Sequence, residues 1–393
     1  MLLPGKTCSM GVLLRSRVAS IVTARGPQPF FSLATLLLGL SVLYGGIVRL
    51  RRKLYRRGLL TRKELPCPVI SVGNLAVGGT GKTPMVIHLA VHLEMLGYRC
   101  AILSRGYKGA AETKGAVVSD GKTILCGARQ AGDEPYLMAT QLHGVPVLVG
   151  RDRYTAGMEA VKRYRPDVIL LDDGYQHLRL KRDLNIVLMD AEHPFGNGHL
   201  LPRGTLREPV DALHEADVVV LTRSEKTRPG TFTRLRRMVH PRPLFACRHQ
   251  SVPRGALKSG SFFADRLEPV DGALGDLRKG SGFAFAGLGR NDAFFQAITC
   301  SGMPLAGEMG FEDHHIYSHE DLIHIGRSAE TTGAGFLVTS DKDFVRLPRD
   351  GRFSRDLIVL GVEMDFGRQK EAWWGYMDEW VTEMTERQAR DDA

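Results

Sequence analysis

A glycine-rich loop between a strand pattern and a helical pattern constrains the fold of this 393-residue chain more than any other feature. The sequence PVISVGNLAVGGTGKTP (68–84) has AVGGTGKT (76–83) at its centre, a phosphate-binding pattern in which Ala76 replaces the usual first glycine. In such a loop the glycines turn backbone N–H groups toward phosphates, the lysine reaches the β and γ oxygens, and the hydroxyl binds Mg²⁺. The sequence therefore predicts a site for a nucleoside triphosphate.

The residues of this loop have separate expected tasks. Lys82 is the expected catalytic cation, and Thr83 is an expected metal ligand. Partition and septum-siting ATPases share the GGTGKT core but carry a further lysine where this chain has Val77, so the chain does not fit that class. The expected ATP-binding residues are Ala76, Val77, Gly78, Gly79, Thr80, Gly81, Lys82 and Thr83.

Two adjacent carboxylates follow a second buried strand pattern. In DVILLDDGYQH (167–177), four apolar residues lead to Asp172 and Asp173. A P-loop protein needs a strand that ends in a carboxylate beside the phosphates, where it holds Mg²⁺ directly or through water. Neighbouring side chains of a strand point to opposite faces, so we expect one acid at the metal and the other at the substrate or acting as a base. Both are candidate metal ligands.

Apolar stretches alternate with amphipathic ones along the chain, which predicts an α/β fold: a P-loop NTPase-like, doubly wound parallel sheet. Several strands are apolar at nearly every position, as strands covered on both faces must be. After the strand at 68–73 and a helix from Lys82 to about Gly97, we expect strands at 100–104, 145–150, 167–173, 184–190 and 216–222.

A second, smaller α/β domain is expected towards the C-terminus. Its strands are predicted at 282–287, 335–340 and 356–362, with helices near 291–299, 318–328 and 370–385. Prolines and glycines interrupt the pattern before it. The expected boundaries are a P-loop domain at 66–225, a linker region at 226–281 and the C-terminal domain at 282–393.

The N-terminal part of the chain has the pattern of a membrane anchor. Residues 30–48 form an uncharged run of 19 residues, long enough for a helix to cross the hydrocarbon core. A basic juxtamembrane segment at 49–65 follows, which predicts that the body lies on the cytoplasmic side. A cleaved signal peptide and a helix lying in the membrane interface are the alternatives. The extension at 1–29 carries no fold signal.

The net charge of +10 does not indicate nucleic-acid binding. Residues 1–65 hold 12 of the 53 Lys and Arg residues but only one of the 43 acids, so the rest of the chain is nearly neutral. A basic terminal segment suits an anionic membrane surface, and the neutral body argues against nucleic acid as a partner.

A series of motifs runs along the chain in a fixed order. The N-terminal one extends from Ser41 to Pro84 and includes the glycine-rich loop. The joint order of the later motifs is more specific than any one of them. These motifs are LSRGYKG (103–109), GDEPYLMA (132–139), GRDR (150–153), DDGYQH (172–177), PRGTLREP (202–209), FAGLGR (285–290), FEDHH (311–315) and TSDKDFVRL (339–347). Together and in this order they resemble the tetraacyldisaccharide 4'-kinase family of lipid A synthesis.

The resemblance implies an ATP- and Mg²⁺-dependent kinase that phosphorylates the 4'-hydroxyl of a tetraacylated glucosamine disaccharide 1-phosphate. It also implies a location at the bacterial inner membrane, with the catalytic body at the cytoplasmic leaflet. By the same resemblance Asp133 is the candidate base and His314 its partner. A carboxylate is suited to take the proton of a weakly nucleophilic sugar hydroxyl, and an imidazole can orient that carboxylate.

Several polar residues in loops after the expected strands are weaker candidates for contacts with substrate or phosphate. Arginine is suited to bidentate phosphate contacts, although an ordinary surface ion pair would explain each of them as well. The candidates are Asn74, Arg105, Arg153, Gln176, Arg207 and Glu208.

Other functions fit the sequence less well. A P-loop ATPase that regulates docking of a protein at the membrane would hydrolyse ATP without an acceptor, and Val77 argues against it. The DHH triplet also occurs in metal-dependent phosphoesterases, but further acids at strand ends are not evident. The chain departs from the family pattern at Ala76, Tyr175, Arg290 and Asn291, and none of these changes removes an expected catalytic group.

Overall fold

The strand that precedes the glycine-rich loop lies inside an eight-stranded sheet. The computed structural model describes residues 20–22, 32–263, 267–270 and 280–391. The strand order is β3-β4-β2-β5-β1-β6-β7-β8, and every neighbouring pair is parallel except β3 with β4. The strands are β1 (Val69–Asn74), β2 (Cys100–Ser104), β3 (Ala116–Asp120), β4 (Pro146–Val149), β5 (Val168–Asp172), β6 (Leu184–Asp190), β7 (Val218–Thr222) and β8 (Leu244–Ala246).

Helices cover both faces of this sheet because the strands are apolar on both sides. In β6, Ile186 and Leu188 face one core cluster and Val187 and Met189 face another. The first cluster packs under α3 (Lys82–Met95), α5 (Asp133–Gln141) and α11 (Lys370–Asp391), and the opposite face packs under α6 (Arg153–Tyr164) and α7 (Thr231–Val239). The predicted doubly wound P-loop fold is therefore confirmed.

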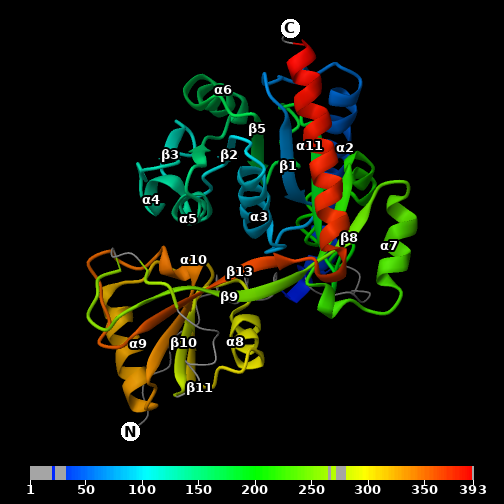
Figure 1. Ribbon diagram of the computed structural model, residues 1–393. Helices are drawn as coiled ribbons and strands as arrows, with labels where there is room; N and C mark the ends of the chain where they lie inside the picture. Colours follow the sequence, from blue (N-terminus) through cyan, green and yellow to red (C-terminus); the bar gives the residue numbers. More distant parts are fainter. Residues whose placement is uncertain (1–19, 23–31, 264–266, 271–279, 392–393) are drawn as a thin grey trace.

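The second α/β body has a five-stranded sheet in the order β11-β10-β12-β13-β9, in which only β9 is antiparallel to its neighbour. Its two faces are covered by α8 and α9. Figure 1 shows this body below the edge of the large sheet at which β1 ends. Its elements are β9 (Arg248–Leu257), β10 (Gly282–Ala286), α8 (Asn291–Cys300), β11 (Leu305–Gly310), α9 (His319–Thr331), β12 (Phe336–Ser340), α10 (Asp341–Phe344) and β13 (Leu357–Asp365).

The boundaries between the two bodies differ from the expected ones. The expected linker at 226–281 contains α7 and β8 of the first body and β9 of the second. Pro253 lies within β9, and this is tolerated because β9 is an edge strand with a register shift opposite it. At the other end, α11 leaves the second body and packs on the core of the first through Trp373 and Met377.

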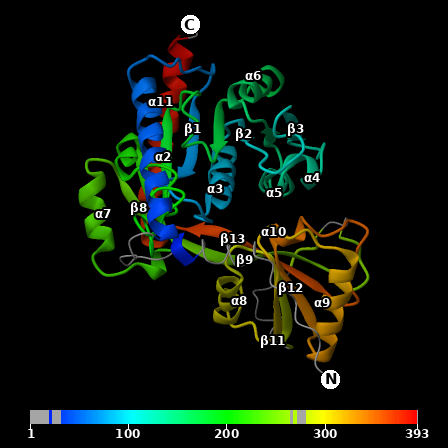
Figure 2. The same cartoon turned by 180° about the vertical axis from the view of Figure 1, so that it is seen from behind.

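The N-terminal apolar segment forms one helix, α2 (Leu33–Arg56), which is long and apolar enough to cross a membrane. It includes the first half of the expected basic segment, while most of the expected extension at 1–29 lies outside the described residues. The buried positions Ser41, Gly45 and Arg52 form a stripe along the helix. Figures 1 and 2 show α2 against the first body, with α11 on the opposite side. The helix is therefore docked on the body along much of its length.

The packing of α11 on α3 generates a prediction about acid stability. His88 of α3 stacks on Phe366 and Trp374, and burial, together with His92 and Lys370, lowers its pKa from 6.5 to about 4. Between pH 6.5 and 4 the unfolded chain therefore binds a proton that the folded chain does not, so stability falls as the pH drops through this window.

Replacement of His88 by Phe keeps the stacked ring and removes the titration. From pH 7 to pH 5, His88→Phe should lose about 2 kcal/mol less stability than the unmodified chain. Urea unfolding at the two pH values measures this difference, and His324→Phe on the exposed side of α9 is the control. Equal losses in all three proteins would contradict the assignment.

Candidate active site

The glycine-rich loop connects β1 to α3 at the edge of the large sheet that faces the second body. Gly81 has φ of +88°, and a Cβ there would lie 2.6 Å from His249 Nε2, so both the backbone and the space favour glycine. Asn74 is fully buried, and its amide Nδ2 donates to Thr80 Oγ1 at 3.0 Å. Gln176 Nε2 donates to the Asn74 carbonyl at 2.8 Å. Asn74 and Gln176 thus stabilise the conformation of the loop through hydrogen bonds.

A segment that follows β6 forms backbone hydrogen bonds with the loop. Val77 N donates to Thr205 O at 2.7 Å, and Arg207 N donates to Leu75 O at 2.7 Å. Ala76 and Leu206 form an antiparallel bridge between these contacts. The backbone of the phosphate loop is therefore paired like a short strand on one side, which leaves its curved part free to face a ligand.

The two adjacent acids lie in different environments, as their positions on a strand end predict. Asp172 is buried and accepts a hydrogen bond from Ser104 Oγ at 2.9 Å. Asp173 has φ of +48° and turns toward Lys82, with Nζ to Oδ1 at 3.6 Å, and toward Arg207, with Nη1 to Oδ2 at 2.8 Å. Burial, then the charges of Glu134 and Asp173, raises the pKa of Asp172. For Asp173, Lys82 and Arg207 outweigh the opposing effect of burial and lower the pKa.

The donor groups at this point fit a magnesium ion. Buried atoms Asp172 Oδ1 and Asp173 Oδ1 have no hydrogen-bond partner among the described residues, and the Thr83 side chain is buried nearby at the start of α3. Carboxylate and hydroxyl oxygens are the ligands that Mg²⁺ prefers. The described residues contain no group of three or more His, Cys, Asp or Glu side chains arranged around one point. Mg²⁺ is usually held by one or two carboxylates together with phosphates and water.

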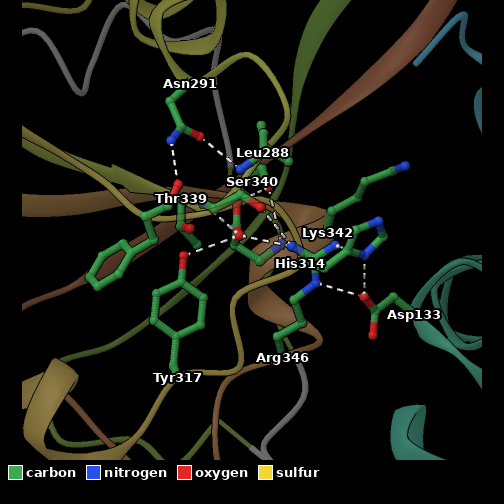
Figure 3. A network of polar contacts seen from close by, with 12 residues as sticks. Asp133, Leu288, Asn291, His314, Tyr317, Thr339, Ser340, Lys342 and Arg346 are labelled. Atoms are coloured by element: carbon green, nitrogen blue, oxygen red, sulfur yellow. Dashed lines mark hydrogen bonds and ion pairs between the residues drawn. The ribbon is translucent and has the colours of Figure 1, made fainter. Parts of the chain in front are cut away.

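The two bodies meet at Asp133, the first residue of α5. Its Oδ2 is 3.1 Å from His314 Nδ1 and accepts a hydrogen bond from Arg346 Nε at 2.8 Å, and both partners belong to the second body. Figure 3 shows His314 and Arg346 directed at this carboxylate. The buried Arg346 also donates through Nη1 to Gly287 O at 2.9 Å and is 3.3 Å from Asp343 Oδ1. Asp133 is thereby fixed across the interface between the bodies.

These contacts determine the charge of Asp133. Burial alone would raise its pKa, but the hydrogen bonds and charges of His314 and Arg346 outweigh burial and lower it. The neighbouring Glu134 pairs with Lys342 Nζ at 2.7 Å, and its pKa is lowered first by Lys342 and also by Lys82 of the phosphate loop. Asp133 is therefore an ionised carboxylate, and the residue after it interacts with a charge of the phosphate loop. It lines a cleft of about 1560 Å³ between the bodies.

Three of the weaker candidates have partners within the protein. Glu208 is 2% exposed and pairs with Arg52 of α2 at 2.8 Å, so it is an internal counter-ion and is not available to a substrate. Arg153 is 5% exposed and donates to the Arg151 carbonyl. Arg105 is exposed and pairs with Glu112. Among the candidate arginines, only Arg207 makes a direct contact with the acid pair in the described part of the chain.

Some residues of the site were not predicted as functional. Arg346 and Lys342 belong to the quoted TSDKDFVRL motif, but no local pattern shows that they reach Asp133 and Glu134 in the other body. Arg223, which follows β7 with φ of +55°, donates to the Gly79 carbonyl and pairs with Asp190. A non-glycine residue at positive φ is uncommon, and such residues concentrate at functional sites.

The sheet, the phosphate loop and the strand-end acids together define a P-loop nucleotide-binding protein whose second body completes the site. Residues 33–381 match the family described as tetraacyldisaccharide-1-P 4'-kinase. The chain therefore belongs to the tetraacyldisaccharide 4'-kinase family, as the motifs indicated.

Individual relatives agree with this assignment. The chain is 45% identical to the tetraacyldisaccharide 4'-kinase of Pelobacter propionicus over 328 residues, which covers 82% of this chain and 86% of the relative. It is 38% identical to the enzyme of the same name from Desulfatibacillum aliphaticivorans, covering 90% and 94%. The crystal structure of LpxK from Aquifex aeolicus in complex with ATP is similar, with a TM-score of 0.70 and 32% identity over 90% of this chain and 100% of that one.

The contacts of Arg346 predict a large effect of its removal. Arg346→Leu leaves the carboxylates of Asp133 and Asp343 without this counter-ion, which should cost about 3–5 kcal/mol of unfolding free energy. Arg349→Leu is the matched control, because Arg349 is exposed and its hydrogen bond is to Tyr136 Oη. That control should cost less than about 1 kcal/mol. Denaturant unfolding measures both changes, and similar values would contradict the buried role of Arg346.

Proposed function

We propose that this chain transfers the γ-phosphate of ATP to the 4'-hydroxyl of a tetraacyldisaccharide 1-phosphate at a membrane surface. The observation that carries this proposal is the carboxylate of Asp133, held ionised between the two bodies and adjacent in sequence to Glu134, which interacts with the charge of Lys82 in the phosphate loop. Family membership supports the choice of substrate and reaction. The relative solved in complex with ATP supports the choice of phosphate donor.

Asp133 would act as the base. Its Oδ2 is held by His314 and Arg346, which leaves Oδ1 to accept the proton of the 4'-hydroxyl. As that O–H bond breaks, the sugar oxygen forms a bond to the γ-phosphorus, and the bond from phosphorus to the bridging oxygen of ADP breaks. His314 and Arg346 favour the ionised carboxylate, so the base is ready at neutral pH.

Lys82 and the loop amides would hold the triphosphate. The Lys82 ammonium lies against Asp173, and a bound phosphate would offer it a second anionic partner. Thr83, Asp172 and Asp173 would hold Mg²⁺, which supplies charge neutralisation at the phosphates when bound. Arg207 contacts Oδ2 of Asp173, whereas Lys82 lies closer to Oδ1, so the two cations orient this carboxylate together.

The outer face of α2 would contact the membrane that contains the substrate. This face exposes large apolar side chains, and the exposed basic residues Arg49, Lys53 and Arg56 lie at its C-terminal end. Each such charge gains about 1 kcal/mol near an anionic leaflet. A helix lying partly in the interface keeps its inner contacts with the body, so we favour it over a helix surrounded by lipid. The exposed apolar residues are Leu36, Leu38, Leu40, Val42, Leu43, Ile47 and Leu50.

On this basis we place the catalytic body at the cytoplasmic leaflet of a bacterial inner membrane, with no role for nucleic acid. A membrane-docking ATPase is the alternative function. It would release phosphate from ATP at full rate without a lipid acceptor, whereas a kinase requires the acceptor for turnover.

The reaction is tested by incubating the protein with γ-labelled ATP, Mg²⁺ and tetraacyldisaccharide 1-phosphate in detergent micelles. Label should appear in the lipid, and Lys82→Ala should lower this rate about 100-fold or more, because the variant loses a cation that stabilises the transferring phosphate. Lys122→Ala, at an exposed turn after β3, is the control and should retain the rate. Label that reaches only inorganic phosphate would indicate the ATPase instead.

Replacement of the proposed base should separate chemistry from binding. Asp133→Asn should lower kcat by about 10²–10⁴-fold, because an amide cannot take the proton from the sugar hydroxyl. The ATP affinity should change little, since Asp133 contacts His314 and Arg346 and not the phosphate loop. Steady-state kinetics and equilibrium nucleotide binding measure the two effects, with Asp292→Asn on the exposed side of α8 as control. A large loss of ATP affinity would instead place Asp133 in the nucleotide or metal site.

A further inference from the structure

The inner face of α2 makes several hydrogen bonds to a short segment of the first body, residues 200–208, which we call the bridging segment. Ser41 Oγ is 2.8 Å from the Leu200 carbonyl and accepts a hydrogen bond from Arg203 N at 2.9 Å. Tyr44 Oη donates to the Arg207 carbonyl at 2.8 Å. These are contacts to backbone groups, so they fix the path of the segment and not merely one side chain.

The same segment contacts the phosphate loop on its other side. The N–H of Arg207 donates to the Leu75 carbonyl at 2.7 Å, and the Thr205 carbonyl accepts from Val77 N at 2.7 Å. The Arg207 side chain then reaches Asp173, which is also the partner of Lys82. Arg207 therefore connects three parts of the protein. Its carbonyl accepts a hydrogen bond from Tyr44 of α2, its N–H donates to the phosphate loop, and its guanidinium pairs with Asp173.

A buried ion pair makes a second connection between α2 and the bridging segment. Arg52 is 4% exposed, with Nη1 at 2.8 Å from Glu208 Oε2 and Nη2 at 2.7 Å from Glu215 Oε2. The guanidinium also lies over the ring of Tyr175 at 5.4 Å. Glu208 N in turn donates to the Leu75 carbonyl at 3.3 Å. Because Arg52 is enclosed by these groups, it is not available to lipid phosphates.

We propose that Tyr44 and Arg52 are positioning residues for phosphate transfer, which act through the bridging segment on the phosphate loop and Asp173. The apolar helix is then part of the catalytic scaffold as well as a lipid contact. The inference rests on the proposed function for its lipid readout, but its first readout, ATP affinity, does not need the lipid. A change in how α2 is seated on the body would change the loop that binds the triphosphate.

Tyr44→Phe is the sharpest test, because it removes a single hydroxyl without changing charge or ring volume. Its ATP–Mg²⁺ affinity and its kcat should each fall about fivefold, as expected for the loss of one hydrogen bond that shapes the site. The KM for the lipid and the flotation with anionic vesicles should stay at wild-type values, and the thermal midpoint should fall by only about 2–4 °C. Tyr55→Phe, the same substitution at another half-buried tyrosine of α2, is the control and should change none of these quantities.

Arg52 variants give a second, independent measurement. Arg52→Gln should weaken ATP binding more than Tyr44→Phe does, and Arg52→Lys, which keeps the charge but not the double contact, should lie between Arg52→Gln and the wild type. If Arg52→Gln does not fold, Tyr44→Phe and Arg52→Lys decide the question.

The outcomes are distinguishable. Wild-type ATP affinity and kcat in Tyr44→Phe would overturn the inference, as would a change confined to lipid KM or vesicle flotation, since that would make α2 an anchor only. If the unmodified protein binds ATP but labels no lipid, the proposed function fails. The shift in ATP affinity would still support or overturn the role of Tyr44.

Discussion

The curvature of the phosphate loop is the constraint on which the rest of this structure depends. A loop that directs its N–H groups at phosphates must have its outer backbone groups satisfied by other parts of the protein. Here the Leu75 carbonyl is bound by the bridging segment and the Gly79 carbonyl by Arg223, while Asn74 holds Thr80 from within. The loop is thus formed by the fold around it, and its own glycines supply only the freedom to adopt that shape.

The second constraint is the need to balance the charge of several buried or partly buried carboxylates in the site. Asp172, Asp173, Asp133 and Glu134 are carboxylates at one sheet edge, and each is balanced differently. Cations of the second body neutralise the pair at the start of α5, whereas Lys82 and Arg207 both pair with Asp173 and leave Asp172 Oδ1 without a hydrogen-bond partner in the described part of the chain. A buried carboxylate without a paired cation is unfavourable. This position therefore fits a divalent ion.

The sequence predicted the sheet well where strands are continuous and apolar. The expected strands at 100–104 and 184–190 coincide with β2 and β6, because burial on both faces leaves a clear local pattern. The sequence does not predict β8 or β9. A strand of three residues such as β8 is too short to show a pattern, and prolines such as Pro253 in β9 are typical of loops.

The same limit applies to side chains of the site. The phosphate loop and the acids after β5 were evident because their chemistry is encoded in consecutive residues. Arg346 and Arg52 could not be assigned, because a basic residue in a motif or in a basic run carries no local sign that its partner is an acid far along the chain. Only the family resemblance predicts that Asp133 and His314 act together. In the structure, Asp133 Oδ2 lies 3.1 Å from His314 Nδ1.

The path of the chain between the two bodies has a consequence for biosynthesis. The polypeptide leaves the first body after β8, builds the whole second body, and returns only with α11, whose Trp373, Met377 and Val381 complete the core beneath α3. Most of the first body is therefore synthesised before α11, the helix that completes its core. Until α11 emerges, an apolar surface on α3 remains uncovered, and exposed surface of this kind makes a partly folded chain prone to aggregation.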